Sequence, residues 1–409
     1  MGITLRMAWR NLWRHSRRTW LTVSAIAFSA ALLVFMIALQ LGSYAMIINV
    51  TLRVFPGDIQ VQHAGYNSRP KIRSTVPAAD ALAERIRQDT IAHSVAVRGY
   101  GFALASSRDR SYGVQVVGVQ PQYEGGVSTI PGLVRNGRYL ASSGKDEAVI
   151  GALLARNLRI KVGDELTLLG SAKDGSMAAT VLPVVGIFQS GSPDIDRNMV
   201  EIPLATFRNV FSMGTDAHAI VIDASDIGQL PKLLNEVRSL LPQRANLVAL
   251  PWQELVPGLE QLIRMDMASA WFTYLSLIIV VTFSILNTFL MAVLERTREF
   301  GLMLALGSSP LTIGRLILLE SLLLTLIGLA VGVVLGAGVS WYFYVRGLTF
   351  PGMKELYAQY GLPGVLYPQI SLLALFLGPA AILVFTSMAA LYPALRIRRL
   401  RPVDAMQAI

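Results

Sequence analysis

The chain has 409 residues, of which 53% are hydrophobic and 15% charged, and its mean hydropathy is +0.50. It is too apolar for an ordinary soluble protein and too polar for a chain that lies wholly in lipid, so membrane-spanning and water-exposed parts are both expected. The absence of cysteine excludes disulfides, thiolate metal sites and lipid attachment through cysteine. The net charge of +10 comes mainly from arginines beside apolar stretches, which indicates membrane orientation and no nucleic-acid partner.

The first 18 residues are expected to form an amphipathic helix on the cytoplasmic membrane surface. Leu5, Trp9 and Trp13 fall on one face and arginines on another, as in helices that lie in the headgroup layer. A plain charged flank that only sets topology is the alternative. Residues 19–53 follow as the first transmembrane helix and a stalk, because residues 20–48 carry no charge and exceed the ~20 residues needed to cross the hydrocarbon. A cleaved signal peptide would have an apolar run of only ~7 to 15 residues.

Residues 54–259 are expected to form a water-soluble block. Two β-α-β patterns, at its start and at its end, predict one α/β subdomain built from residues 54–111 and 216–259. The intervening residues 112–215 are rich in β-branched residues, glycine and turn signals, and predict an inserted β-rich subdomain. The expected fold class is therefore an α-helical membrane protein with four transmembrane helices and a large α+β extracytoplasmic domain between helices 1 and 2.

Three further spans are expected. Residues 260–294 form a stalk and the second transmembrane helix, residues 316–345 the third and residues 370–395 the fourth. An outer loop at 346–369 and a basic cytoplasmic tail at 396–409 complete the chain. With four spans both termini share a side, and their arginines place that side in the cytoplasm.

Two features mark the third span. Glu320 is the only charged residue inside the apolar runs 268–294, 316–345 and 370–395, and it is near enough to Arg315 to pair with it or to snorkel. Gly328, Gly332 and Gly336 recur every four residues, and such a stripe lets two helix backbones approach closely. The neighbouring helix belongs either to a partner subunit or to the same chain.

A short, charge-led helical segment lies between the second and third spans, over residues 295–307. Glu295 and Arg298 are spaced to pair at i,i+3, and apolar residues follow them. Gly307 and Pro310 then stop the helix, because glycine suits the left-handed cap and proline cannot continue a helix. An ordinary cytoplasmic loop with a solvated charge cluster is the alternative reading.

The run E-R-T-R-E-F-G-L-M-L-A-L-G-S-S, followed by the sequence around Glu320 and by the glycine stripe, resembles the signature of the FtsX-like permease family. That family includes the lipoprotein-releasing Lol permeases and the MacB-type exporters. The resemblance implies that the segment is a coupling helix that docks on an ATP-hydrolysing subunit. The docking residues that it implies are Glu295, Arg296, Arg298, Glu299, Phe300, Gly301, Ala305, Leu306 and Gly307. The water-soluble block similarly resembles the family's extracytoplasmic core, in which a "porter" subdomain lies beside a small β-rich one.

The chain shows no motif for catalysis of its own. No Gly-x-x-x-x-Gly-Lys-Ser/Thr phosphate loop occurs, so ATP and magnesium are expected in a separate ATPase subunit. The four histidines lie far apart and predict no zinc site or other metal site. An ion-driven carrier is disfavoured, because such carriers place ionisable groups or broken helices at mid-membrane.

The leading hypothesis is the membrane subunit of an ABC transporter, not itself an enzyme, in a bacterial inner membrane. By resemblance, two ATPase copies push the coupling helices, and the first two helices transmit the movement to periplasmic domains that handle a lipoprotein, lipid, peptide or other hydrophobic substrate. Further expected partners are a second permease copy or homologue, membrane lipid, and a periplasmic adaptor or chaperone. The alternatives are an FtsX-like regulator of a cell-wall hydrolase and a membrane-anchored sensor without an ATPase.

Overall fold

The computed structural model describes residues 3–14, 16–108, 110–142, 144–224, 226–242, 245–349, 352 and 364–396. The chain divides into two compact units. The helical unit comprises Met1–Met46, Ile263–Phe350 and Val365–Ile409, and the domain comprises Ile47–Leu262 and Pro351–Gly364. Residues 353–363 of the expected outer loop and 397–409 of the expected tail lie outside the described residues.

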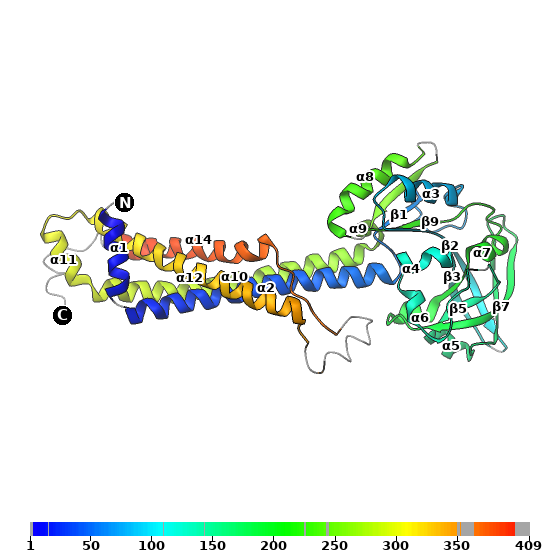
Figure 1. Cartoon of the computed structure of the whole chain (residues 1–409), viewed down its shortest axis with the longest axis horizontal. Helices are drawn as coiled ribbons and strands as arrows, with labels where there is room; N and C mark the ends of the chain where they lie inside the picture. Colours follow the sequence, from blue (N-terminus) through cyan, green and yellow to red (C-terminus); the bar gives the residue numbers. More distant parts are fainter. Residues whose placement is uncertain are drawn as a thin grey trace. The chain divides into compact units, whose positions relative to one another are not determined.

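The helices of the helical unit are mostly long and apolar (Figure 1). They are α1 (Ile3–Arg14), α2 (Ser16–Val54), α10 (Pro257–Glu295), α11 (Thr297–Ala305), α12 (Pro310–Arg346) and α14 (Leu372–Arg396), and both α2 and α10 also contribute residues to the domain. Among the described residues, α2, α10, α12 and α14 are long and apolar enough to cross a membrane. The structure therefore contains the four expected apolar helices.

The first helix is shorter than expected. It ends at Arg14, and Ser16 already belongs to α2, so Arg17 and Arg18 lie on the long helix. The hydroxyl of Thr19 donates a hydrogen bond of 2.5 Å to the carbonyl of Leu12, which satisfies one of the free carbonyls at the end of α1. This contact explains why the amphipathic segment does not continue to residue 18.

The glycine stripe of α12 lies against α2 of the same chain. A Cβ atom added at Gly328 would lie 2.7 Å from the Cβ of Ile26, and one at Gly332 would lie 2.6 Å from the carbonyl oxygen of Ala27. Gly336 has a similarly close contact with α2. The small residues thus let the backbones of α2 and α12 approach more closely than any side chain at these positions would permit.

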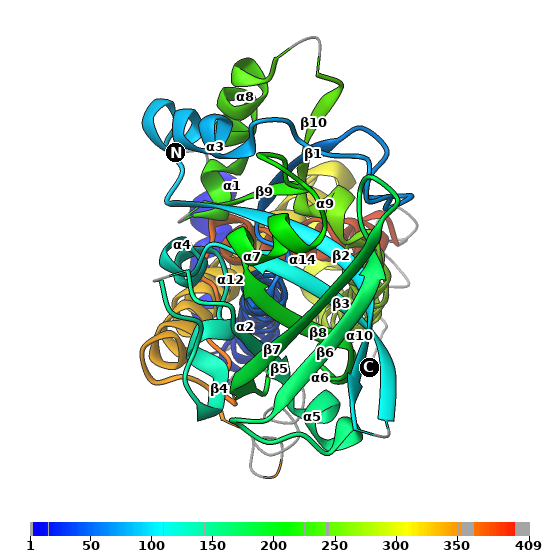
Figure 2. The ribbon, with the colours of Figure 1, turned by 90° about the vertical axis from the view of Figure 1, so that its right-hand side faces the viewer.

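The described residues of the domain form ten strands and several short helices, whose arrangement Figure 2 shows. The strands are β1 (Ile59–His63), β2 (Ser94–Ser107), β3 (Arg110–Val119), β4 (Val134–Gly137), β5 (Ala148–Gly151), β6 (Glu165–Ser171), β7 (Met177–Phe188), β8 (Met199–Pro203), β9 (Ala219–Asp223) and β10 (Leu247–Pro251). The helices are α3 (Ala79–Asp89), α4 (Pro121–Val127), α5 (Ala152–Leu158), α6 (Pro193–Asn198), α7 (Leu204–Val210), α8 (Leu230–Leu240) and α9 (Trp252–Leu255), with 3-10 turns η1 (Ile130–Leu133) and η2 (Ile227–Gln229).

One part of the domain is an antiparallel sheet with the order β10-β1-β9-β2. Strands β1 and β2 run parallel to each other with β9 between them, so that Val61 and Val97 both face Ile220 in the register. Helices α3 and α8 bury the apolar face that their sequences predict, including Leu82 and Leu233. The two β-α-β segments therefore combine into one split β-α-β arrangement, but only the first half of β2, Ser94–Arg98, belongs to it, whereas the expected subdomain included all of residues 54–111.

The other part is a closed barrel. Strand pairs run in a circuit from β2 to β3, β8, β5, β7, β6 and back to β2. The barrel core contains aliphatic side chains and the stacked rings of Phe207 and Phe211, 4.5 Å apart. Gly118 makes room for this pair, because a Cβ there would lie 2.4 Å from the Cβ of Phe207. Strand β2 belongs to both parts, since Ser94–Arg98 pair with β9 and Gly99–Ser107 with β3.

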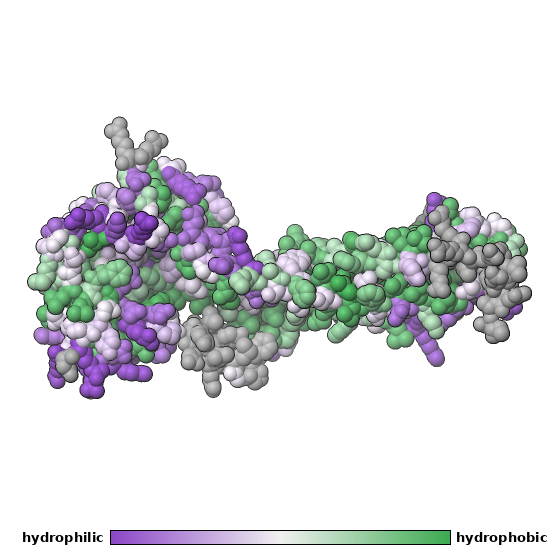
Figure 3. All heavy atoms as spheres, turned by 180° about the vertical axis from the view of Figure 1, so that it is seen from behind, coloured by the Kyte–Doolittle hydropathy of each residue, from purple (hydrophilic) through white to green (hydrophobic). Residues whose placement is uncertain are grey.

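The surfaces of the two units differ in chemistry. Hydrophobic residues cover the long helices almost continuously, whereas hydrophilic residues gather on the domain (Figure 3). The exposed apolar side chains of α10 include Phe272, Val280 and Phe283. A soluble protein rarely exposes so large a contiguous apolar surface, so this one is suited to lipid.

Candidate functional site: the α11 segment

The candidate site is the short helix α11 and its surroundings in the helical unit. Helix α10 ends at Glu295, and Arg296, with φ −102° and ψ 13°, separates it from α11. The end of α11 follows the sequence signals: Gly307 has φ +92°, and Ser308 N donates to the carbonyl of Met303 at 2.9 Å. Proline 310 then opens α12, with the hydroxyl of Ser309 accepting from Thr312 N.

One face of α11 packs on its own chain. Phe300 is 1% exposed and contacts Val293, Ile313 and Ile317 in a small apolar cluster. Gly301 is buried beside it. Two of the predicted docking residues, Phe300 and Gly301, therefore hold α11 in place and do not offer a surface to a partner.

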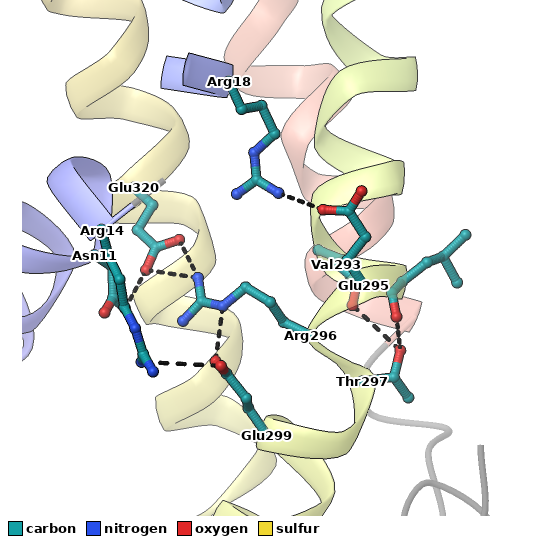
Figure 4. A network of polar contacts seen from close by, with 10 residues as sticks. Asn11, Arg14, Arg18, Val293, Glu295, Arg296, Thr297, Glu299 and Glu320 are labelled. Atoms are coloured by element: carbon teal, nitrogen blue, oxygen red, sulfur yellow. Dashed lines mark hydrogen bonds and ion pairs between the residues drawn. The ribbon is translucent and has the colours of Figure 1, made fainter. Parts of the chain in front are cut away.

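A polar network centred on Arg296 joins α11 to α12 (Figure 4). The Nε of Arg296 lies 3.0 Å from Oε2 of Glu299, and its Nη1 lies 3.1 Å from Oε2 of Glu320. Asn11 of α1 donates to Oε1 of Glu320 at 2.5 Å. The guanidinium also lies 5.2 Å from the centre of the Phe300 ring. Arg296 thus crosslinks the turn before α11, the helix itself and α12.

Two arginines from the N-terminal helices complete the network. Arg18 of α2 donates to Glu295 at 2.8 Å, and Arg14 of α1 lies 3.9 Å from Glu299. Both pairs are partly exposed, so each contributes little stability by itself. Their importance is positional, because they connect α11 and the end of α10 to segments that lie almost 300 residues earlier in the chain.

Two pairings expected from the sequence are wrong. Glu295 pairs with Arg18 instead of Arg298, because the helix is interrupted at Arg296 and the i,i+3 geometry is lost. Glu320 pairs with Arg296 and not with Arg315, since residues five apart lie on different faces of a helix. Asn11 and Arg18 were missed because nothing in the local sequence marks them as neighbours of α11.

The opposite face of α11 is exposed. It carries Arg298, Leu302, Ala305 and Leu306, spaced at i, i+4, i+7 and i+8, with Gly307 at its end. Leu302 is 55% exposed and Leu306 is 78% exposed. Leu302 was not among the predicted docking residues, although its spacing from Arg298 places both on one side of the helix. These residues therefore form an exposed, mostly apolar strip with one arginine.

The domain holds a second group of buried charges. Arg98 and Glu124 are fully buried and form an ion pair, and the hydroxyl of Tyr139 donates to Oε2 of Glu201 at 2.7 Å. Burial, followed by the nearby charge of Glu124, raises the pKa of Glu201 to about 8. Its Oε1 has no hydrogen-bond partner among the described residues.

His218 lies in the same domain and is held as a neutral ring. Its Nδ1 accepts from Tyr100 N at 2.9 Å, and its Nε2 lies 3.0 Å from the carbonyl of Ile72, to which the neutral tautomer donates. Burial lowers the pKa of His218 to about 4. In the described part of the chain, no three His, Asp or Glu side chains are grouped to hold a metal ion.

Comparison with known proteins gives two family matches. Residues 271–402 match the model described as FtsX-like permease C-terminal, and residues 19–240 match the MacB-like periplasmic core domain. The lipoprotein-releasing system transmembrane protein LolE of Haemophilus influenzae is 24% identical over 372 residues, covering 85% of each chain. LolC of Neisseria meningitidis is 20% identical and covers 75% of each chain.

A third relative is longer than this chain. The macrolide export ATP-binding/permease protein MacB of Agrobacterium fabrum is 26% identical over 377 residues, which are 88% of this chain and 55% of that protein. The chain thus spans about half of MacB. The matches place the α11 segment in the FtsX-like region and the strands and helices up to α8 in the MacB-like core.

Proposed function

Because the chain belongs to the FtsX-like permeases with a MacB-like periplasmic core domain, which are ABC transporter permeases that work with ABC ATPases, we propose that α11 is its ATPase-docking helix and that it drives the domain mechanically. In this proposal the ATPase grips the exposed face of α11. ATP binding and hydrolysis occur on the partner, and the movement of α11 is the input to this chain.

The two-faced structure of α11 is the observation that carries the proposal. Its inner face is fixed by Phe300 and the Arg296 network, while Arg298, Leu302 and Leu306 remain exposed. An isolated nine-residue helix is marginal in water, so the inner contacts are needed to keep this one formed. A preformed helix binds a partner without the additional entropy cost of folding.

The connections of α11 favour transmission through two long helices. A single residue, Arg296, joins α11 to α10, and the last residue of α10 is bonded to Arg18 of α2. A push on α11 therefore acts on α10 directly and on α2 through Glu295. Both helices continue into the domain, which makes them suitable stalks for mechanotransmission.

The names of the relatives guide the choice of substrate. LolE and LolC are lipoprotein-releasing proteins and MacB is a macrolide exporter, so we assign to this chain a hydrophobic or lipidated substrate handled on the outer side of a bacterial inner membrane. The functional assembly would contain two ATPase copies and a second permease, identical or homologous. Both termini would be cytoplasmic and the domain periplasmic, with an adaptor or chaperone as a further partner.

The proposal is tested by copurification with the P-loop ATPase encoded nearest to the gene. Leu306→Glu places a charge directly after the last residue of α11, at a side chain that is 78% exposed. We expect at least a tenfold loss of ATPase binding, measured with the purified subunits in nanodiscs. Met177→Glu is the matched control, because Met177 is 77% exposed but lies in the domain.

Two results would contradict the docking proposal. One is unchanged binding by Leu306→Glu, and the other is an equal loss with Met177→Glu. If the wild-type chain binds no ATPase at all, a membrane-anchored sensor without an ATPase becomes the better reading.

A further inference from the structure

The end of α2 is bound by two separate segments of the domain, the turn at Ser128 and Thr129 and the strand β2 at Arg98. The last carbonyl groups of a helix have no partner within the helix. Here the carbonyl of Arg53 accepts from Thr129 N at 2.7 Å, and that of Val54 accepts from the hydroxyl of Ser128 at 2.9 Å. The carbonyl of Phe55, the next residue, accepts from Nη1 of Arg98. Three consecutive carbonyls are thus held by side chain and backbone donors from distant positions.

We call these contacts at the end of α2 the joint, and Arg98 is at its centre. Its guanidinium is fully buried, bonded through Nε and Nη2 to the two carboxylate oxygens of Glu124, and stacked 4.4 Å from the centre of the Phe55 ring. A two-point arginine–carboxylate pair fixes the direction of both side chains. The buried positive charge also lies at the negative end of the α2 dipole, where it is favoured.

The joint is continuous with the core of the domain. Glu124 belongs to α4, and Ser128 and Thr129 form the turn between α4 and η1. Phe55 packs on the cluster that contains Val127 and Ile130. Any displacement of the α2 end must therefore break buried polar bonds or carry this core with it.

Arg98 is also the residue at which β2 passes from the split β-α-β sheet to the barrel. It pairs with Ala219 of β9, and the next residue, Gly99, pairs with Gly118 of β3. A force that reaches Arg98 is therefore delivered to the split β-α-β sheet and to the barrel at the same point.

We infer that Arg98 and Glu124 are positioning residues that lock the end of α2, residues 47–54, to both parts of the domain, so that this end and the two parts move together. The inference rests on the proposed function, because it specifies how the movement of a stalk helix reaches the domain. It assigns this role to the buried ion pair and to the donors of Ser128 and Thr129, which no sequence motif marked.

The test uses the complete complex in nanodiscs and the absence of native cysteine. One copy per complex carries fluorophores at Asn49→Cys on α2 and Arg156→Cys on α5, both exposed positions. Single-molecule energy transfer measures the distance between them without nucleotide and with ATP and vanadate. The test variant is Arg98→Met with Glu124→Gln, which removes both charges and leaves no unpaired buried ion.

The wild type should show one narrow distance distribution in both nucleotide states. In the double variant we expect the distribution to broaden at least twofold while ATP turnover stays within twofold of the wild type. Arg208→Met is the matched control, because Arg208 likewise joins a carboxylate, that of Asp80, to backbone carbonyls. Among the described residues it forms no hydrogen bond or ion pair with α2, so its loss should leave the distribution narrow.

A narrow distribution in the double variant would overturn the inference. If that variant does not fold, Phe55→Leu with Ser128→Ala keeps the ion pair and removes two contacts to the α2 end, and a distribution as narrow as the wild type would again overturn it. A failure of the proposed function has a different signature, which is the absence of ATP turnover in the wild-type complex.

Discussion

A single methyl group on the glycine stripe should push α2 and α12 apart. In Gly332→Ala, the new Cβ would lie 2.6 Å from both the carbonyl oxygen of Ala27 and the Cβ of Ala30. Favourable contacts between carbon atoms lie at about 3.5–4.0 Å, so relief requires a shift of about 1 Å. Neither blocking atom can rotate away, because one is backbone and the other is a Cβ. Overpacking of this kind costs about 1–3 kcal/mol.

The same helix supplies the control. A Cβ at Gly338 would have no atom within 4 Å, so Gly338→Ala adds only helix propensity, which favours alanine by up to about 1 kcal/mol. Gly332→Ala has the same propensity gain, which cancels, so the two variants should differ by the overpacking cost of about 1–3 kcal/mol in the free energy of unfolding. Titration of detergent micelles with dodecyl sulfate, followed by circular dichroism, measures this difference. Equal stability of the two variants would refute the close packing of α2 on α12.

Three further predictions concern charged and titrating groups. Arg296→Met and Glu320→Gln should each cost more than half of the stability that the double variant loses. A double-mutant cycle should therefore give a coupling energy of about 0.5–3 kcal/mol between the two side chains, and a coupling of zero would show that the pair does not form. Because the pKa of Glu201 is raised from its ordinary 4.5 to about 8, the unfolded chain releases this proton at lower pH than the folded one, so stability falls as pH rises from 4.5 to 8. Glu201→Gln should flatten this decline in melting temperature, and an unchanged slope would contradict the assignment. The pKa of His218 is lowered to about 4, so the stability that the neutral ring provides is lost as pH falls from 6.5 towards 4. His218→Gln should therefore reduce the loss of stability at acid pH in urea unfolding, and an unchanged loss would contradict the lowered pKa.

Much of the fold was readable from local patterns. Uncharged runs predict the long helices, and the β-α-β pattern at the start of the water-soluble block corresponds to β1, α3 and β2. The end of the charge-led segment followed from Gly307 and Pro310, because capping depends on neighbours in sequence. Local signals therefore fixed the end of this segment, whereas the end of the first helix at Arg14 and the break at Arg296 were not predicted.

The partners of the charged residues were not readable. Glu295 could be assigned a partner only within its own helix, whereas the structure brings it Arg18 from α2. Arg98 occurs in a strand pattern where an arginine normally indicates a solvated face, yet it is completely buried beside Glu124. Such pairs depend on contacts between segments that are distant in sequence, and no periodic pattern in a single sequence indicates those contacts. The docking role of α11 itself stays a prediction.

The position of β9 between β1 and β2 has a consequence for biogenesis. During synthesis β1 and β2 emerge first, but the strand that joins them arrives only after the whole barrel segment from Arg110 to Val210. Until then the facing edges of β1 and of the first half of β2 lack the strand that joins them, and such edges invite wrong pairing. The barrel strands, by contrast, are complete before β9 appears, and closing the barrel fixes the second half of β2. The barrel can therefore close before the sheet is complete, and the nascent chain stays open to wrong pairing until β9 has emerged.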